Sequence, residues 1–237
     1  MNDHPIHTAV FPHLTRPSDS RPITPSTLPV GTPYYEETPC PLGSIGNPRR
    51  KGDWMLTAGG TAYWPIDPRA EEVFITDIAH SLAMQCRYAG HSKFFYSVAE
   101  HSIHVSRMVP EEHALVALMH DATEAYVTDV PRPLKPSLTN FAEIEEKNWR
   151  VIAEAFDLEW VVPECVHEAD QLICHSEMRL LMPTPPLPLN TPGEDPHVQL
   201  SFLGHVAAEE AFLERFQELW DARDRRLYPA NDLRRAT

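Results

Sequence analysis

The sequence predicts an all-α fold, with a short hairpin before the helices and an extended, proline-rich arm before the hairpin. Beyond Pro68, apolar residues recur at helical spacing in successive segments. Strands do not alternate with these segments, as a parallel α/β sheet would require. The chain has 237 residues, 42% of them hydrophobic and 23% charged. This is enough for one sizeable core or two small ones.

The first 53 residues are predicted to form an extended or disordered arm, because they combine Pro, Ser, Thr and Gly without an apolar period. In the run from Trp54 to Asp67, the Gly59-Gly60 pair separates two apolar or aromatic stretches, as in a short hairpin. We therefore assign residues 54–222 to the helical domain and residues 223–237 to a C-terminal tail.

Two helices are expected after the hairpin. Thr76 or Asp77 can cap the first, which should end near Gly90. Its apolar stripe consists of Ile78, Leu82 and Cys86. The second helix should run from Ser97 to about Met108.

The next two helices have clear start signals. Proline and two acids at Pro110-Glu111-Glu112 favour a helix start, and this helix should stop before Pro131. Asn140 and Glu143 resemble a capping box at the start of the following helix. The apolar residues expected to be buried are Leu115, Leu118, Met119, Ala122, Ile144, Val151, Ile152 and Ala155.

A further helix should begin at Pro163-Glu164 and continue to about Leu181. Residues 183–196 break all periodicity. A last amphipathic helix then closes the domain with Val206, Phe212, Phe216 and Leu219.

Charge and cysteine spacing exclude several classes of protein. The net charge of −14 repels nucleic acid, and no apolar run approaches the roughly 20 residues of a membrane span. The N-terminal residues lack a secretory signal. No CxxC spacing indicates a zinc ribbon or a disulfide framework, so we expect the cysteines to be small buried residues: Cys40, Cys86, Cys165 and Cys174. We expect a cytoplasmic homo-oligomer without nucleic-acid or membrane partners.

Four polar residues occupy helical positions where a core would favour leucine, namely His101, His120, Asp121 and Asp170. Singly, each is an ordinary surface or core residue. Together they favour a cation site, because an uncompensated carboxylate after the apolar run 115–119 would be costly. Asp170 lies on the core-facing stripe with Val166 and Ile173. Two imidazoles and two carboxylates suit Zn, Mn, Fe, Co or Ni better than calcium.

The order His … His-Asp … Asp resembles the HD-domain metal-dependent phosphohydrolases, over roughly Asp67 to Leu181. The runs AEHSIHVS, HDATEAYVTDVPRPLK and EAD are similar to the bacterial 5'-deoxynucleotidases and their phage-type relatives, which include a dATP triphosphohydrolase. The run WPIDPRAEEVFITDIAHSLAMQCRYAG resembles the phage-type branch. The resemblance implies an HD-domain helical bundle in which the four residues bind metal. Two-metal members of the superfamily insert further histidines, and His167 is the only histidine between Asp121 and Asp170, so we expect one metal.

The resemblance also implies that Glu124 and Asp129 serve as general acid/base and water-positioning groups. Glu124 follows His120 by four residues and Asp121 by three, so helical spacing would place it on their face. Asp129 follows on the loop that leaves this helix. The ordinary alternatives are a solvated helical Glu and a turn Asp.

Arg87 matches the family's phosphate-binding arginine, and Lys135 is a second phosphate candidate, with Arg132 on the same loop. Each has an alternative as a solvated surface residue. The aromatic residues that could stack on a nucleobase are Trp64, Phe95 and Tyr96, although such residues are more often part of a core.

The activity expected from this resemblance is hydrolysis of the 5' phosphate ester of a nucleotide. The segment before Arg87 favours a dATP triphosphohydrolase over a 5'-deoxynucleotidase acting on dNMPs. A nucleotide-binding module without turnover and a protein whose metal only joins helices are the alternatives. The presence of both Glu124 and Asp129 beside the ligands favours an enzyme over either.

Overall fold

A computed structural model describes residues 50–188 and 190–227. The chain divides into two units, Met1–Lys51 and Gly52–Thr237, and all the elements below belong to the second. The predicted arm, apart from its last residues, and residues 228–237 lie outside the described part. This part is mostly helical, as predicted. In neither described range is any helix long and apolar enough to cross a membrane.

The predicted hairpin consists of two short strands, β1 (Met55–Leu56) and β2 (Ala62–Tyr63). They pair antiparallel, with Met55 opposite Tyr63 and Leu56 opposite Ala62. Gly60 in the connecting turn has φ 84, a value that side-chain-bearing residues rarely adopt. The hairpin prediction is therefore confirmed, with strands of two residues each.

Tyr63 fixes the hairpin to the helices. Its ring stacks on Tyr126 with 3.8 Å between ring centroids, and its hydroxyl donates to Asn148 Oδ1 at 2.6 Å. All three residues are buried, so the hairpin is joined to the segments on both sides of residues 127–140.

Helix α1 (Ile75–Met84) starts without a side-chain cap, since its N-cap residue is Phe74. The prediction that Thr76 or Asp77 caps it is wrong: both lie inside the helix. The Asp77 carboxylate accepts the Gly59 backbone N–H at 2.6 Å and so binds the hairpin turn instead. The helix also ends before Gly90, and Cys86 beyond it forms an isolated antiparallel bridge with Ser97.

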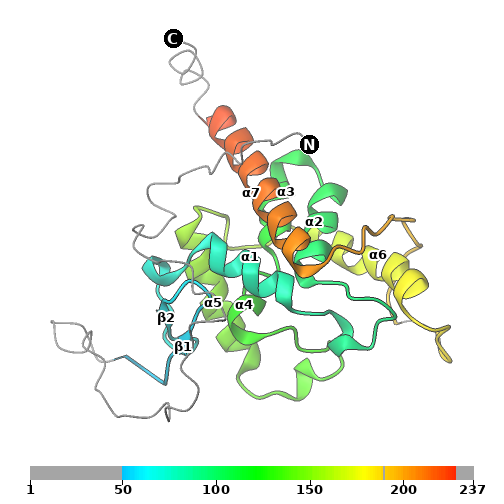
Figure 1. Ribbon diagram of the computed structural model, residues 1–237, viewed down its shortest axis with the longest axis horizontal. Coiled ribbons are helices and arrows are strands. Elements are labelled where there is room, and N and C mark those ends of the chain that lie inside the picture. Colours follow the sequence, from blue (N-terminus) through cyan, green and yellow to red (C-terminus); the bar gives the residue numbers. More distant parts are fainter. Residues whose placement is uncertain (1–49, 189, 228–237) are drawn as a thin grey trace, which may run out of the picture. The chain divides into compact units, whose positions relative to one another are not determined.

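Helix α2 (Val98–Met108) confirms the predicted range, and Ser97 Oγ accepts the Glu100 backbone N–H at 3.1 Å as its cap. Every residue from Val98 to Ser106 is buried. The helix packs against α1, α3, α6 and α7 and is the central element of the bundle (Figure 1). Any polar side chain on α2 must therefore find its partners inside the protein.

The predicted third helix is interrupted. A 3-10 turn at Glu111–His113 leads into α3 (Ala114–Met119), and α4 (Glu124–Val127) follows a separate turn. At the break, His120 Nδ1 donates a hydrogen bond to the Ala117 carbonyl at 2.8 Å. In a continuous α-helix this carbonyl would instead accept a backbone N–H four residues further on. The prediction of one continuous helix is therefore wrong, whereas the predicted stop before Pro131 is confirmed, since α4 ends at Val127.

Two long helices follow, α5 (Phe141–Ala155) and α6 (Glu164–Leu181), and the range of α6 is as predicted. Asn140 precedes α5 in the left-handed conformation, at φ 67, without a side-chain cap hydrogen bond. The predicted capping box is thus wrong, and Glu143 pairs with Lys147 at 2.6 Å instead. Of the apolar residues predicted to be buried on α5, Ile152 is fully buried and the others are partly exposed.

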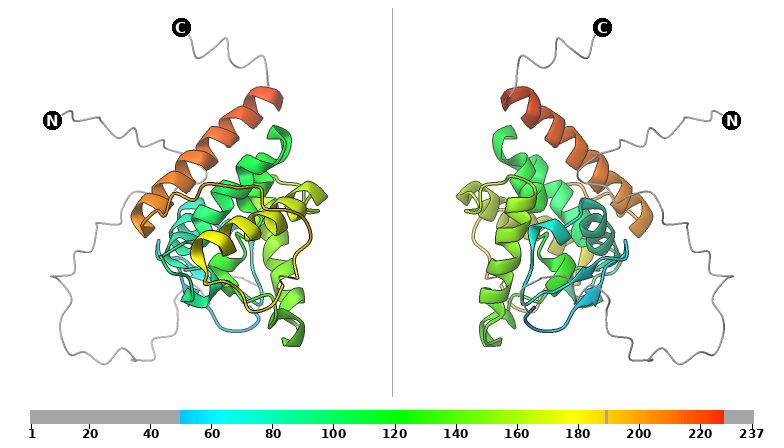
Figure 2. Two further views of the ribbon diagram at one scale, coloured as in Figure 1. Left: turned by 90° about the vertical axis from the view of Figure 1, so that its right-hand side faces the viewer. Right: turned by 90° about the vertical axis from the view of Figure 1, so that its left-hand side faces the viewer.

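The last helix, α7 (His205–Leu227), packs against α1, α2 and α3 (Figures 1 and 2). It continues past residue 222, where we placed the end of the domain. Its predicted apolar residues Phe212, Phe216 and Leu219 are buried, whereas Val206 in the first turn is exposed. The described cysteines are free and partly exposed, not fully buried as predicted: Cys86, Cys165 and Cys174. Cys40 lies outside the described residues.

Glu100 of α2 determines how the chain enters α7. Its buried carboxylate accepts the backbone N–H groups of Ser201, Phe202 and Leu203 at 2.7, 2.9 and 2.8 Å. A single buried side chain thereby holds the backbone of residues 201–203, directly before α7.

Candidate metal centre

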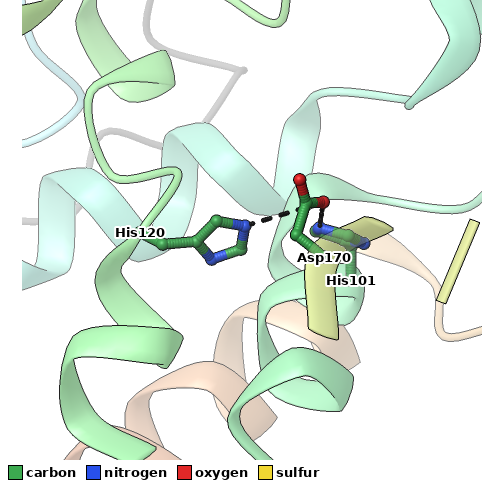
Figure 3. A group of neighbouring side chains, drawn as sticks. All are labelled: His101, His120 and Asp170. Atoms are coloured by element: carbon green, nitrogen blue, oxygen red, sulfur yellow. Dashed lines mark ion pairs between the residues drawn. The ribbon is translucent and has the colours of Figure 1, made fainter. Parts of the chain in front are cut away.

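Two imidazoles and a carboxylate from three elements meet in the bundle. His101 comes from α2, His120 from the turn after α3 and Asp170 from α6 (Figure 3). Their ligand atoms lie within 4.8 Å of one another. Asp170 Oδ1 is 3.1 Å from His101 Nε2 and 4.0 Å from His120 Nε2. This group could hold a metal ion, so the predicted meeting of these three residues is confirmed.

Asp121, the fourth predicted ligand, lies beside both imidazoles. Its Oδ2 atom is 3.3 Å from His120 Nε2 and 3.6 Å from His101 Nε2. The structure therefore brings all four predicted residues together, two of them histidines and two of them aspartates.

The other ring nitrogen of each histidine determines how the ring is protonated. His101 Nδ1 donates to Glu177 Oε1 at 2.7 Å, and His120 Nδ1 donates to the Ala117 carbonyl at 2.8 Å. Since a carboxylate and a carbonyl can only accept, Nδ1 carries the proton in both rings. In the neutral imidazole each Nε2 then has a lone pair directed at carboxylate oxygens.

These two Nε2 atoms are buried and have no hydrogen-bond partner in the described part of the chain. Asp170 lies close to His101 Nε2, but the contact is not aligned as a hydrogen bond. Lone pairs facing carboxylates repel unless a proton or a cation lies between them. A divalent cation therefore fits the donor set.

A proton takes the same place when no cation is bound. Burial and Arg87 act to lower the pKa of His101, but Glu177 and Asp170 outweigh them and raise it to about 9. The carboxylate of Asp170 responds in the opposite sense: burial would raise its pKa, but His101, His120 and Arg87 lower it below the usual range. The centre therefore holds a positive charge near neutral pH whether or not metal is present.

Glu177 is the buried partner of this site that the sequence analysis missed. It accepts from His101, from Tyr96 Oη at 2.9 Å and from Tyr88 Oη in a short hydrogen bond, and it lies 3.5 Å from the Arg87 guanidinium. Burial would raise the pKa of Glu177, but Arg87 and His101 lower it to about 2. It follows Asp170 by seven residues, two turns along the same face of α6, and that spacing could have identified it.

Arg87 lies at the centre, as the resemblance implied. Its side chain is only 12% exposed, and its guanidinium is 3.5 Å from Asp121 Oδ2 as well as from Glu177. Nε of Arg87 is buried and has no hydrogen-bond partner among the residues that the structure describes. A guanidinium anchored in this way keeps a fixed positive charge next to the candidate metal ligands.

Glu124 lies within electrostatic reach of Asp121 and Arg87 although α3 and α4 are separate helices. Its carboxyl group is buried, with Oε1 3.9 Å from Lys135 Nζ and Oε2 without a hydrogen-bond partner in the described residues. Burial and the nearby Asp121 and Asp129 raise the pKa of Glu124 to about 9. The carboxyl group is therefore one that readily holds a proton near neutral pH.

Asp129 lies within electrostatic reach of the same centre. Burial raises its pKa, and Asp121 adds to the rise, while Arg87 and His101 oppose it. The backbone N–H of Asp129 donates to Gln85 Oε1 at 3.0 Å. Gln85 is a second residue that the sequence analysis missed, because its contacts with this segment are to residues about forty positions along the chain, which no local pattern indicates.

The two loop cations also face the centre. Lys135 Nζ is 2.9 Å from Glu145 Oε1 in addition to its contact with Glu124. Arg132 is largely exposed, with NH2 3.7 Å from Asp170 Oδ2. Arg132 therefore lies next to a candidate ligand, and Lys135 lies next to Glu124.

Of the three residues predicted to stack on a base, the structure contradicts the prediction for one. Tyr96 is fully buried against Leu181 and Leu200, and its hydroxyl is held by Glu177, so the prediction that it stacks on a base is wrong. Trp64 lies beside Trp54, with 6.5 Å between ring centroids, and Phe95 is half exposed. For these two residues base stacking stays a prediction.

These helices and the buried His/Asp group define a helical protein with a candidate metal centre. No family model matches the sequence. The chain is 47% identical over 126 residues to the Escherichia coli protein named uncharacterized protein YfdR, an alignment that covers 53% of this chain and 71% of YfdR. It is also 30% identical over 129 residues to an uncharacterized protein of Rhodobacter capsulatus, covering 50% of this chain and 66% of that protein. The chain therefore belongs to the family of YfdR.

Proposed function

We propose that this chain is a metal-dependent phosphohydrolase of the HD-domain type that cleaves the 5' phosphate ester of deoxynucleotides. The observation that carries the proposal is the pair of buried Nε2 atoms, unpaired within the described chain, that face Asp121 and Asp170. A metal that merely joined helices would not need the buried carboxyl group of Glu124 beside it.

Each residue of the centre has a distinct task in this proposal. The residues that would hold one Co, Mn, Zn, Fe or Ni ion are His101, His120, Asp121 and Asp170. The ion would neutralise phosphoryl oxygens and lower the pKa of water. Arg87 binds the charge of the phosphoryl group next to the scissile ester, because its guanidinium is fixed by Asp121 and Glu177.

Glu124 handles the proton. Its Oε2 atom is buried and free of hydrogen bonds within the described residues, so it can take a proton from the attacking water and return one to the leaving 5' oxygen. The raised pKa of Glu124, about 9, lets the carboxyl group hold the proton that the leaving 5' oxygen receives. Asp129 orients the water from the adjacent loop.

We infer that the substrate is a deoxynucleoside triphosphate, with dATP preferred. A triphosphate brings negative charge beyond the scissile ester, and the loop that follows Asp129 carries two cations that could bind it, Arg132 at 3.7 Å from Asp170 and Lys135 at 3.9 Å from Glu124. A 5'-deoxynucleotidase acting on dNMPs is the second candidate. The ion pair between Lys135 and Glu145 favours this candidate, because the charge of one of the two loop cations is then already neutralised and less is left to bind the outer phosphates.

The experiment compares dATP and dAMP as substrates of protein that has been freed of metal and reloaded with Mn²⁺ or Co²⁺. Chromatography should find deoxyadenosine and triphosphate from dATP, and Glu124→Ala loaded with the same metal should give neither. Turnover of dAMP alone would indicate the deoxynucleotidase. Nucleotide binding without turnover would indicate a binding module, and undiminished turnover in protein verified to be free of metal would refute the proposal.

A further inference from the structure

We propose that Gln85 is a positioning residue that holds Asp129 at the metal centre by clamping both ends of residues 124–129 to the end of α1. The catalytic importance of this placement rests on the proposed function. The placement itself follows from the contacts of one side-chain amide.

The amide of Gln85 uses both its donor and its acceptor side. Nε2 donates to the Glu124 carbonyl at 2.9 Å and to Ser81 Oγ at 3.2 Å. Oε1 accepts from Thr128 Oγ1 at 3.1 Å and from the Asp129 backbone N–H at 3.0 Å. The segment that carries Glu124 and Asp129 is therefore bound at both ends by a single side chain.

The backbone of Gln85 is fixed in turn to the start of α2. Its carbonyl accepts the Val98 N–H at 3.1 Å, and the Arg87 N–H donates to the Tyr96 carbonyl at 2.9 Å. Helix α2 carries His101 three residues further on. The clamp therefore connects the loop with Asp129 to the same framework that carries a candidate metal ligand and Arg87.

Thr128 explains why this loop needs a clamp. Its backbone has φ 68 and ψ 155, a region that glycine adopts readily and a β-branched residue almost never does. Such a residue persists only where its surroundings force it. The two groups that Gln85 Oε1 holds are the hydroxyl of Thr128 and the next N–H along the chain, so the hydrogen bonds act on the strained peptide itself.

Without the clamp, Thr128 would relax to negative φ, and the direction of the peptide leading into Asp129 would change. The Asp129 carboxylate would then leave its position relative to Arg87 and His101. Small misplacements of a reacting group reduce turnover steeply, whereas Arg87 and the candidate metal ligands lie outside residues 124–129 and keep their positions. The expected effect is thus on kcat and not on metal content.

The test is a double-mutant cycle of Gln85→Met with Thr128→Gly, and Gln199→Met is the control because Gln199 is exposed and distant in sequence from the clamp. Gln85→Met should lower kcat by about 10- to 100-fold, with KM and bound metal unchanged. Because glycine adopts this backbone conformation without strain, the same substitution in the Thr128→Gly background should cost at most about threefold. A loss of equal size in both backgrounds would overturn the proposal.

A second measurement does not depend on activity. Hydrogen exchange of peptides covering residues 124–130 should be about tenfold faster in Gln85→Met than in the wild type or in Gln199→Met. If Gln85→Met does not fold, Thr128→Val replaces it, since valine keeps the branched side chain and loses only the hydroxyl bond. It should raise the same exchange by about threefold.

The two proposals can fail separately. If the wild type turns over no nucleotide with any metal, the proposed function is wrong, and exchange alone then decides on the clamp. Faster exchange at residues 124–130 supports it, and exchange equal to that of the wild type overturns it.

Discussion

Replacing Glu177 by Gln should weaken metal binding although Glu177 is not itself a candidate ligand. In the wild type, Oε1 accepts from His101 Nδ1 and Tyr96, while Oε2 accepts from Tyr88 and faces Arg87. Glutamine has one oxygen and one NH2 group, so one of these two pairs of donors would meet another donor.

The magnitude follows from which pair loses its acceptor. If the NH2 group faces His101, the ring must move its proton to Nε2, the atom that would bind the metal, or lose the hydrogen bond. If it faces Arg87, a buried guanidinium loses a charged partner. Loss of a partner that orients a metal-binding histidine reduces affinity by about 10- to 100-fold, or about 1.4–2.7 kcal/mol, once each titration is corrected for the proton that His101 loses on binding.

The assay is a competition titration of Mn²⁺ or Co²⁺ against a chromophoric chelator, on protein that circular dichroism shows to be folded. Glu154→Gln makes the same chemical change at an exposed position of α5 and should bind metal like the wild type. Equal affinities of Glu177→Gln and the wild type would refute the argument that the Nδ1 partner of His101 prepares Nε2 for a metal.

Three further outcomes are expected. Glu124→Ala should keep its metal and lose most turnover, whereas Asp121→Ala should lose both metal and stability. If elemental analysis found that the two variants lose metal equally, Glu124 would be a ligand. The metal-free pKa of His101 is about 9, and a metal binds only the neutral ring. The apparent metal affinity should therefore rise about tenfold per pH unit between pH 6 and 8. Calorimetry that detects no proton release on metal binding would contradict this. Glu100→Ala should lower the free energy of unfolding by about 2–4 kcal/mol in urea titrations, since three N–H groups of residues 201–203 lose their acceptor. A change below about 1 kcal/mol would show that water replaces the carboxylate as the acceptor.

The sequence predicted those helices best whose start signals are local. Ser97 caps α2 and Pro163 precedes α6, and both ranges agree with the structure. The errors arise where a side chain binds a distant group or a competing local one. Asp77 reaches back to the hairpin turn at Gly59, and His120 takes the carbonyl that would have continued α3.

The same distinction holds for the candidate site. The four candidate ligands could be identified because polar residues within apolar helical stripes need a partner in the core. Glu177 shares a helical face with Asp170 and was within reach of the same reasoning. Gln85 was not, because its role depends on where α1 ends and on the backbone conformation of Thr128. Tyr96 was assigned to the substrate because an aromatic residue in a sequence does not show whether its ring is covered.

The charges around the candidate metal centre explain how an acidic chain could bind a phosphate. Arg87, Arg132 and Lys135 all lie near the candidate ligands, but each is already next to at least one carboxylate. With His101 protonated and Glu124 neutral, these positive and negative charges nearly balance, so a centre without a bound metal offers little net attraction to a phosphate. A divalent ion at the Nε2 atoms of His101 and His120 adds positive charge locally, while the net charge of −14 still repels long polyanions. We therefore expect the metal to bind before the nucleotide, and the substrate of the proposed function to be a small anion.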